Sequence, residues 1–542
     1  MEILEWIDKK HSDRNKKLSD YKYFEHTVVG GICFLTLIFT LSYALLSRTV
    51  YFWDSSTYWD ISSMLAKKPI NFGFISEVYN SVGTSDYNYL VAVPVALWLK
   101  MFGTSRVSYI AAITLFYLIP SELAIYKLSK RISKAPLVAF AITVAIIPSL
   151  MYLTAIGFID VAGVFVALLC YLIYFKDEKN TKDSVILGVL LTLIMVVRRY
   201  FAFFSVSFVT VMIIDAILFK KDRKKLFITL LSLALTLVVF LYPFLRNILL
   251  KDYGALYAGY KYNPVTDIKL ITRYFGLTFL LTLLASVPYA IVKKHEIKGA
   301  FALLQMLICV FMFVSTQTHG QQHLLLYVPA LAVIVITGIN AIQKQWMFIF
   351  ICILAAVNML SPCIWRTQPQ NIQEIKSLAL FPSYSVKPEK RDDIHELIAL
   401  RRILDEQIPE GEKCGVLASS FVINSSIIEN VIESVNMKET REDQYITGLP
   451  EVDSRDYWRL DELYSINYLL VATPAQTHLA KGQQTIVEEA VSSFSNYTDI
   501  ARFFERVTGF KARIGNINLE LYRRIGDITE TAKTEYRLRL YK

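Results

Sequence analysis

Charged residues are scarce in this chain. Only 19% of its 542 residues are Asp, Glu, Lys or Arg, whereas 54% are hydrophobic, and the mean hydropathy is +0.40. This composition is too apolar for a soluble enzyme and indicates a polytopic membrane protein. We predict about eleven transmembrane helices from the apolar runs, which fall near 26–47, 106–126, 135–152, 160–175, 184–197, 200–219, 226–245, 271–292, 299–316, 324–341 and 346–364.

Cysteine patterns are also missing. Cys363 lies at the end of an apolar run, Cys414 stands alone near the C-terminus, and the other four cysteines lie inside apolar runs: Cys33, Cys170, Cys309 and Cys352. This arrangement shows no disulfide framework and no metal-ligand spacing. The two histidines of "HGQQH" (319–323) lack a third ligand, so we assign no metal and no cofactor. The use of a divalent metal stays open.

The net charge of +10 does not indicate nucleic-acid binding, because the basic residues gather in loops between apolar runs. If the N-terminus is cytoplasmic, "KLSKRISK" (127–134) and "KKDRKK" (220–225) fall inside, while "TQTHGQQH" (316–323) outside has no Lys or Arg. We therefore expect a cytoplasmic N-terminus, a retained first helix at 26–47, and an extracytoplasmic C-terminal region.

The segment "YLVAVPVALWL" (89–99) is apolar but too short to cross a bilayer, which requires about 20 helical residues. It also contains Pro94. A crossing here would invert every later loop against the distribution of basic residues. We expect a juxtamembrane or re-entrant helix inside one long outer loop, residues 48–105.

The composition changes after Trp365. A polar linker leads to β-like runs at 414–419 and 468–473, which alternate with helical patterns at 485–494 and 498–507. The sequence thus predicts a membrane domain over 1–365 and an extracytoplasmic soluble α/β domain over 366–542.

Polar residues gather at the predicted outer ends of the helices. Asp54 follows the first span within "YFWDSSTYWD", Asp160 opens the fourth, and Arg198 and Arg199 interrupt an apolar run. The same side carries Asp60, Arg246, His319, Gln321, Gln322 and His323. Any one of these residues could cap a helix or extend to the interface, but no salt-bridge spacing in the sequence pairs them. We expect them to converge at one outer mouth.

Such a set suits group transfer from a lipid phosphate. Arg198, Arg199, Arg246 or His323 could neutralise the phosphate, because arginine donates two parallel hydrogen bonds to such groups. The acceptor hydroxyl needs a base, for which we choose Asp54, with Asp160 as its partner. Tyr58 and Glu77 are weaker outer-loop candidates for substrate binding, and Glu77 is also readily interpreted as a solvated loop residue.

The order of these motifs resembles the C superfamily of membrane glycosyltransferases, in the branch of protein O-mannosyltransferases and the lipid A aminoarabinose transferase. "WDSSTYWDISSMLAKKP" has Asp54 and Tyr58 in the places of the family's first outer loop. "GQQHLLLYVPALAVI" matches the late outer loop, with His323 where an Arg is usual. Ser55 also stands where many members have Glu. The resemblance implies a polyprenyl-phosphate sugar donor and inversion at the anomeric carbon.

The expected function is transfer of one monosaccharide to a cell-surface glycan, lipid or protein at the outer face of the cytoplasmic membrane. The expected partners are the lipid-linked donor, the acceptor, the bilayer and a polyprenyl-phosphate sugar synthase of the same pathway, but no nucleic acid. One alternative is a transporter or flippase of lipid-linked intermediates, although the sequence shows neither an internal repeat nor a mid-membrane charge typical of transporters. A non-catalytic membrane scaffold is another.

Overall fold

The computed structural model describes residues 15–219, 223–294, 296–365, 375–435, 437, 441 and 443–540. The chain forms two compact units. The first comprises Met1–Leu46, Tyr58–Lys251 and Tyr262–Lys387, and the second comprises Ser47–Thr57, Asp252–Lys261 and Pro388–Lys542. Two short segments that are remote in sequence from the C-terminal region therefore belong to the second unit. The predicted domain boundary stays a prediction, and the linker at 366–374 lies outside the described residues.

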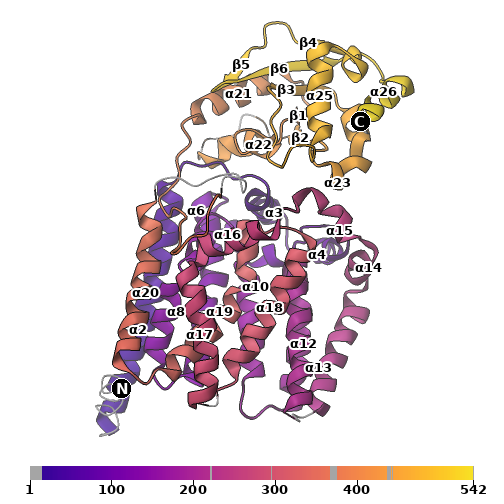
Figure 1. Cartoon of the computed structure of the whole chain (residues 1–542). Helices are drawn as coiled ribbons and strands as arrows, with labels where there is room; N and C mark the ends of the chain where they lie inside the picture. Colours follow the sequence, from indigo (N-terminus) through magenta and orange to yellow (C-terminus); the bar gives the residue numbers. More distant parts are fainter. Residues whose placement is uncertain are drawn as a thin grey trace. The chain divides into compact units, whose positions relative to one another are not determined.

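All eleven predicted apolar runs form helices in the first unit, and Figure 1 shows α2, α8, α10, α12, α13, α17, α18, α19 and α20 running alongside one another. The elements are α2 (Asn15–Leu46), α6 (Arg106–Ile113), η2 (Thr114–Leu118), α7 (Ile119–Ile132), α8 (Pro136–Ile146), α9 (Ser149–Ala155), α10 (Val161–Tyr174), α11 (Thr181–Val197), η3 (Arg199–Phe201), α12 (Ala202–Leu218), α13 (Arg223–Leu235), η4 (Thr236–Phe240), α14 (Tyr242–Leu250), α16 (Pro264–Phe275), α17 (Leu277–Lys294), α18 (Lys298–Thr316), η6 (Gln321–Leu326), α19 (Val328–Ala341) and α20 (Gln345–Ile364).

Length and composition allow five helices of the described chain to cross a membrane singly, or eight if each of three bent pairs is one span. The bent pairs are α8 with α9, α13–η4 with α14, and α16 with α17. The other three predicted spans, α10, α11 and α19, have 14, 17 and 14 residues and are shorter than a typical span. The fold is that of a polytopic helical membrane protein, and the number of eleven crossings stays a prediction.

Small residues let these helices approach closely. A Cβ atom on Gly188 of α11 would lie only 2.5 Å from the Thr229 carbonyl oxygen of α13. A Cβ atom on Gly163 of α10 would overlap the ring of Phe201, which precedes α12. Close packing of this kind holds helices together where lipid removes the hydrophobic driving force. The contact between Gly163 and Phe201 also holds the residues that follow Arg198 against the start of α10.

The predicted first outer loop is largely helical, with α3 (Asp54–Lys67), α4 (Phe72–Thr84), η1 (Leu90–Ala92) and α5 (Val93–Phe102). The helix predicted from "DSSTYWDISSMLAKK" is confirmed as α3. The segment 89–99 is a short apolar helix as expected, while its place relative to the membrane stays a prediction. In Figure 1, α4 and α16 lie at the end of the helix bundle opposite the start of α2.

The second unit is built on a mixed sheet with strand order β2-β1-β3-β6-β4, and β5 pairs with β6. The strands β1 (Cys414–Leu417), β2 (Ile446–Gly448) and β3 (Tyr468–Thr473) are parallel, whereas β6 (Ile517–Arg524) runs antiparallel to β3, β4 (Phe504–Arg506) and β5 (Ala512–Ile514). Its helices are α15 (Tyr253–Leu256), η5 (Ala258–Tyr260), α21 (Ile394–Gln407), α22 (Ser425–Ser434), α23 (Asp453–Asp456), η8 (Tyr457–Arg459), α24 (Leu460–Ser465), α25 (Thr485–Asn496), η9 (Asp499–Phe503) and α26 (Glu530–Leu540).

Separate apolar cores bury β1 completely and every residue of β3 except Thr473. One core gathers residues of α21 and α22, and the other gathers residues of α24, α25 and α26. The strands predicted at 414–419 and 468–473 are confirmed as β1 and β3, and the helix at 485–494 as α25. The helix predicted at 498–507 is wrong. That stretch is a short 3-10 turn followed by β4, because Phe504 is drawn into the core and its neighbours pair with β6.

Candidate functional site

A buried ion pair joins the start of α10 to the end of α11. The Asp160 carboxylate is 1% exposed, and its Oδ1 lies 3.1 Å from Nε of Arg198. The Tyr200 hydroxyl donates a hydrogen bond to the same oxygen at 2.6 Å. Because a buried carboxylate requires compensation by a cation and by hydrogen bonds, these contacts explain how Asp160 remains inside the helix bundle.

The Arg198 guanidinium is also surrounded by aromatic rings. Its central carbon lies 4.8 Å from the ring centre of Tyr87, 5.4 Å from that of Tyr58 and 5.8 Å from that of Tyr200. The negative ring faces attract a cation at such distances. Arg198 is therefore held by the protein itself, with only 9% of its side chain exposed.

A second, more open group lies next to this pair. The carboxylate of Asp86 is 2.7 Å from Nη1 of Arg199 and 2.9 Å from Nζ of Lys251. About half of the Asp86 side chain and a third of the Lys251 side chain are exposed. Burial alone would raise the pKa of Asp86, but Arg199 and Lys251 outweigh it and hold the pKa below its usual value. Two cations thus converge on one accessible anion.

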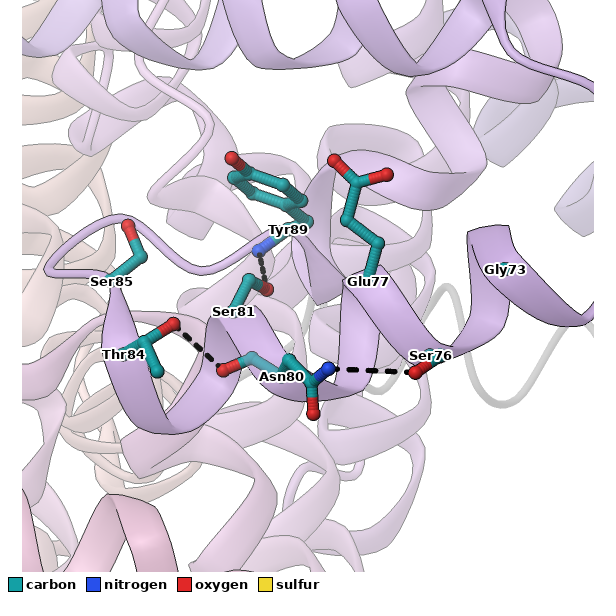
Figure 2. Close-up of a pocket in the computed structure, with 8 residues that line it drawn as sticks. All are labelled: Gly73, Ser76, Glu77, Asn80, Ser81, Thr84, Ser85 and Tyr89. Atoms are coloured by element: carbon teal, nitrogen blue, oxygen red, sulfur yellow. Dashed lines mark hydrogen bonds between the residues drawn. The ribbon is translucent and has the colours of Figure 1, made fainter.

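The loop that carries Asp86 and Tyr87 is fixed by its own hydrogen bonds. The Asn88 side-chain amide donates to the Val196 carbonyl at the end of α11, and the Tyr89 backbone N–H donates to Ser81 Oγ at 2.9 Å. Figure 2 shows this loop beside α4, where Tyr89 and Ser81 line an open pocket of about 420 Å³.

Glu77 lines this pocket, whereas its carboxylate contacts Lys68 at 2.5 Å. The ion-pair partner of Glu77 is therefore Lys68 and not Arg199 or Lys251. Its role in substrate binding stays a prediction, and its exposed ion pair fits the interpretation as a solvated loop residue.

The late outer loop brings His323 to the same region. The ring centres of His323 and Tyr200 are 4.8 Å apart, and Nδ1 of His323 accepts a hydrogen bond from the Gly320 N–H at 2.8 Å. His323 is half-buried. It is positioned beside the Asp160–Arg198 pair through Tyr200.

His319, the other histidine of "HGQQH", is fully buried, unlike His323. It is 0% exposed, its Nδ1 contacts the Asp267 carboxylate and its Nε2 contacts the Tyr327 hydroxyl. In this structure its ring nitrogens are both occupied and turned away from solvent. These contacts favour a role in holding the late loop, and direct substrate binding by His319 stays a prediction.

Two predicted site residues come from other segments of the chain. Arg246 is exposed on α14. Asp54 is the first residue of α3 and belongs to the segment 47–57 of the second unit. The residues that the structure does bring together form what we call the polar cluster: Tyr58, Asp86, Tyr87, Asp160, Arg198, Arg199, Tyr200, Lys251 and His323.

Sequence reasoning missed Asp86, Tyr87, Tyr200 and Lys251. It also treated the lack of a salt-bridge spacing as a sign of unpaired charges, which is wrong, because Asp160 and Arg199 find partners in distant segments. The adjacent "DY" at 86–87 in a polar outer loop was the one available signal. Aromatic residues are so common in this chain that this signal is weak.

One acidic side chain is buried inside an apolar stretch, while the expectation that no charge lies near the middle of the membrane stays a prediction. Glu122 lies within the apolar stretch Arg106–Ile132, is fully buried and accepts a hydrogen bond from Thr36 Oγ1 at 2.7 Å. Among the described residues, no group of three or more His, Cys, Asp or Glu side chains is close enough to hold a metal ion. The use of a metal therefore stays an open prediction.

The fold has counterparts among solved structures. No family model and no curated protein matches the sequence. Among solved structures, however, the fold is similar to that of membrane glycosyltransferases of the C superfamily, the family that the sequence resembles.

The chain is similar to ArnT, the lipid A aminoarabinose transferase, from Cupriavidus metallidurans. It matches the structure bound to undecaprenyl phosphate with a TM-score of 0.54 at 9% identity, and the apo structure with 0.55 at 11% identity. Both matches cover 91% of this chain and 97% of ArnT. The archaeal oligosaccharyltransferase AglB from Archaeoglobus fulgidus, in complex with an inhibitory peptide and dolichol-phosphate, matches with a TM-score of 0.40 at 13% identity over 83% of this chain and 69% of AglB.

Proposed function

We propose that the protein is a membrane glycosyltransferase that moves a monosaccharide from a polyprenyl-phosphate carrier to a cell-envelope acceptor. In this proposal the polar cluster faces the outer side of the cytoplasmic membrane, the N-terminus is cytoplasmic and the acceptor is a glycan, a lipid or a protein. The ArnT-like fold supports the class of reaction, since the similar ArnT structure contains undecaprenyl phosphate.

The observation that carries the proposal is the convergence of Arg199 and Lys251 on one accessible carboxylate, that of Asp86. An anionic group of similar size could take the same position. Arginine and lysine are the side chains that bind phosphate, and here they are more exposed than the buried Arg198. We assign Arg199 and Lys251 to the phosphate, and Arg198 to the positioning of its neighbours.

The chemistry follows from the charge that develops on the phosphate. The acceptor hydroxyl oxygen attacks the anomeric carbon, the bond from that carbon to the phosphate oxygen breaks, and its electron pair leaves with the phosphate. The leaving phosphate gains a second negative charge, so two fixed cations stabilise it more than they stabilise the donor. Attack from the opposite face inverts the anomeric carbon.

The hydroxyl proton requires an acceptor, and we assign that role to Asp54. It lies one helical turn before Tyr58 on α3. A positioned base of this kind contributes about 10²–10⁴-fold to the rate. Asp160 is already bonded to Arg198 and Tyr200 and therefore suits an orienting role better than proton transfer.

The direct test is turnover by the purified full-length protein. In detergent micelles with an undecaprenyl-phosphate monosaccharide and an envelope extract as acceptor, the proposal requires release of undecaprenyl phosphate. Asp54→Asn should abolish release while binding of undecaprenyl phosphate persists, and Arg199→Gln should weaken that binding. Normal turnover by Asp54→Asn would remove Asp54 from its role.

Glu122 gives one reason to keep a transporter as a second candidate, because buried acids inside spans often serve transport. Reconstituted vesicles distinguish the two functions. Movement of an intact lipid-linked sugar across the bilayer, without cleavage and dependent on Glu122, would favour the transporter. Neither cleavage nor movement would favour a scaffold.

A further inference from the structure

The segment 47–57 is bonded to the second unit although more than 300 residues separate it from the sheet. The Arg48 N–H donates to the Glu389 carbonyl at 2.8 Å, and the Arg391 N–H donates back to the Arg48 carbonyl at 3.2 Å. The Asn430 side chain donates to the Tyr51 carbonyl at 3.3 Å. These main-chain contacts hold the residues just before α3 in one register.

The ring of Trp53 in this segment packs against other aromatic rings. Its ring centre lies 4.3 Å from that of His478, 5.3 Å from that of Phe421 and 5.1 Å from that of Phe52. We call Phe421 and His478 the aromatic clamp. Aromatic pairs at such distances attract one another beyond the effect of the area that they bury.

The clamp lies at a distinctive place in the sheet. Phe421 follows β1 and His478 follows β3, so both come from loops at the carboxyl ends of adjacent parallel strands. In the sheet, β1 and β3 are neighbours. After β1 the chain continues to β2, which lies on one side of this pair, and after β3 it continues to β4 and β6, which lie on the opposite side. In open α/β sheets this reversal is where ligands bind. Here the occupant is a tryptophan of the same chain.

The clamp is itself held in place. Nδ1 of His478 lies 2.8 Å from the Ser419 carbonyl oxygen, to which it donates, and the His478 N–H donates to Gln484 Oε1 at 2.8 Å. Burial lowers the pKa of His478 to about 4, so the ring is neutral at physiological pH. Ser419 is fixed in turn by donating its hydroxyl hydrogen bond to Glu451 at 3.0 Å.

Trp53 also has an unusual backbone. Its φ is 49°, in the left-handed region that a bulky side chain rarely adopts because it is strained there. The Trp53 carbonyl accepts hydrogen bonds from the N–H groups of Ser56 at 3.1 Å and Thr57 at 2.9 Å. The strained residue thus starts α3, and the contacts of its ring are what can stabilise that conformation.

We propose that Trp53 is a positioning residue through which the second unit fixes the start of α3, and with it the adjacent Asp54. This inference rests on the proposed function only for the role of Asp54 as the base. Within the second unit, the loops after β1 and β3 thereby position the proposed base through a side chain one residue away from it. A displacement of about 1 Å at a reacting group can cost about 10²-fold in rate.

Hydrogen exchange tests the positioning without any assumption about activity. In the full-length protein, Trp53→Ala and Phe421→Ala should speed exchange of the Ser56 and Thr57 amides at least tenfold, while Trp53→Phe should retain most of their protection. Phe503→Ala is the matched control, because Phe503 is a half-buried aromatic of the same unit that packs on the other core. It should leave these amides unchanged. Unaltered exchange in both clamp variants would overturn the proposal.

Turnover supplies the second readout. Trp53→Ala and Phe421→Ala should lower kcat for release of undecaprenyl phosphate at least tenfold, with KM for the donor and Kd for undecaprenyl phosphate within twofold of the original protein. Trp53→Phe should restore most of kcat. Altered exchange with normal kcat would show that the clamp is only structural. If the original protein turns over no donor, the proposed function fails, whereas the exchange result still decides whether the clamp holds α3.

Discussion

Removal of the Arg198 guanidinium should destabilise the first unit more than removal of its partner carboxylate. Arg198→Gln leaves the Asp160 carboxylate, 1% exposed, without the cation now 3.1 Å away. Breaking a buried ion pair in this way typically costs about 3–5 kcal/mol. The lost attraction to the rings of Tyr87 and Tyr58 adds to this cost.

Asp160→Asn should cost less, about 1–3 kcal/mol, because the guanidinium keeps its aromatic neighbours and an amide oxygen can still accept the hydrogen bond from Tyr200. The double variant should be more stable than the sum of the single losses implies, by about 1–3 kcal/mol, since it removes both charges. Arg198→Lys is the matched control: it keeps the charge and loses the planar fork.

The assay is the unfolding midpoint of the original protein, the two single variants, the double variant and Arg198→Lys. All five are compared in one detergent, without undecaprenyl phosphate, by tryptophan fluorescence in a denaturant titration. A coupling energy near zero, with Arg198→Gln as stable as the original protein, would refute the reasoning. It would mean that Arg198 does not stabilise the Asp160 carboxylate and that its positive charge is available to bind a substrate.

Three further predictions concern charge and topology. Asp86→Asn should strengthen binding of undecaprenyl phosphate about tenfold, measured by titration, because the carboxylate no longer competes for its two cations; unchanged affinity would contradict this. Burial raises the pKa of Glu451 from 4.5 to about 7, so protonation favours the folded unit, and its stability should fall by up to about 3 kcal/mol as the pH rises from about 4.5 through 7. Amide protection of β1 measures this fall, which Glu451→Gln should abolish. Cysteines placed at the exposed positions Thr84 and Glu178 should react with an impermeant maleimide from outside and from inside the cell, respectively, and labelling from the same side would reject the predicted orientation.

Much of the fold could be predicted because its signals are local. Every predicted apolar run falls on helical sequence, although three of the runs are bent helix pairs, and short apolar runs locate β1 and β3. The stretch 498–507 shows the limit of such patterns. Its residues form β4 only because β6, further along the chain, pairs with them in register.

The candidate site was predictable only in part. Asp160, Arg198 and Arg199 stand out because charged residues interrupt apolar sequence, whereas Asp86 and Lys251 lie in polar loops where a charge is unremarkable. Their significance comes from a shared contact across long sequence separations. No spacing rule for helices reports contacts of that kind.

The role of Trp53 could not be predicted from the sequence either, because it also depends on contacts between residues far apart in the chain. In the sequence it is one of several aromatics beside a span, where tryptophan is common at the membrane interface. In the structure its ring contacts two loops of the distant sheet, and its backbone is strained. Interface tryptophans need no such strain, since a flexible loop can present them in relaxed conformations. A bulky residue held at a positive φ therefore indicates a requirement set by its surroundings, and the neighbour that this conformation directs into α3 is Asp54.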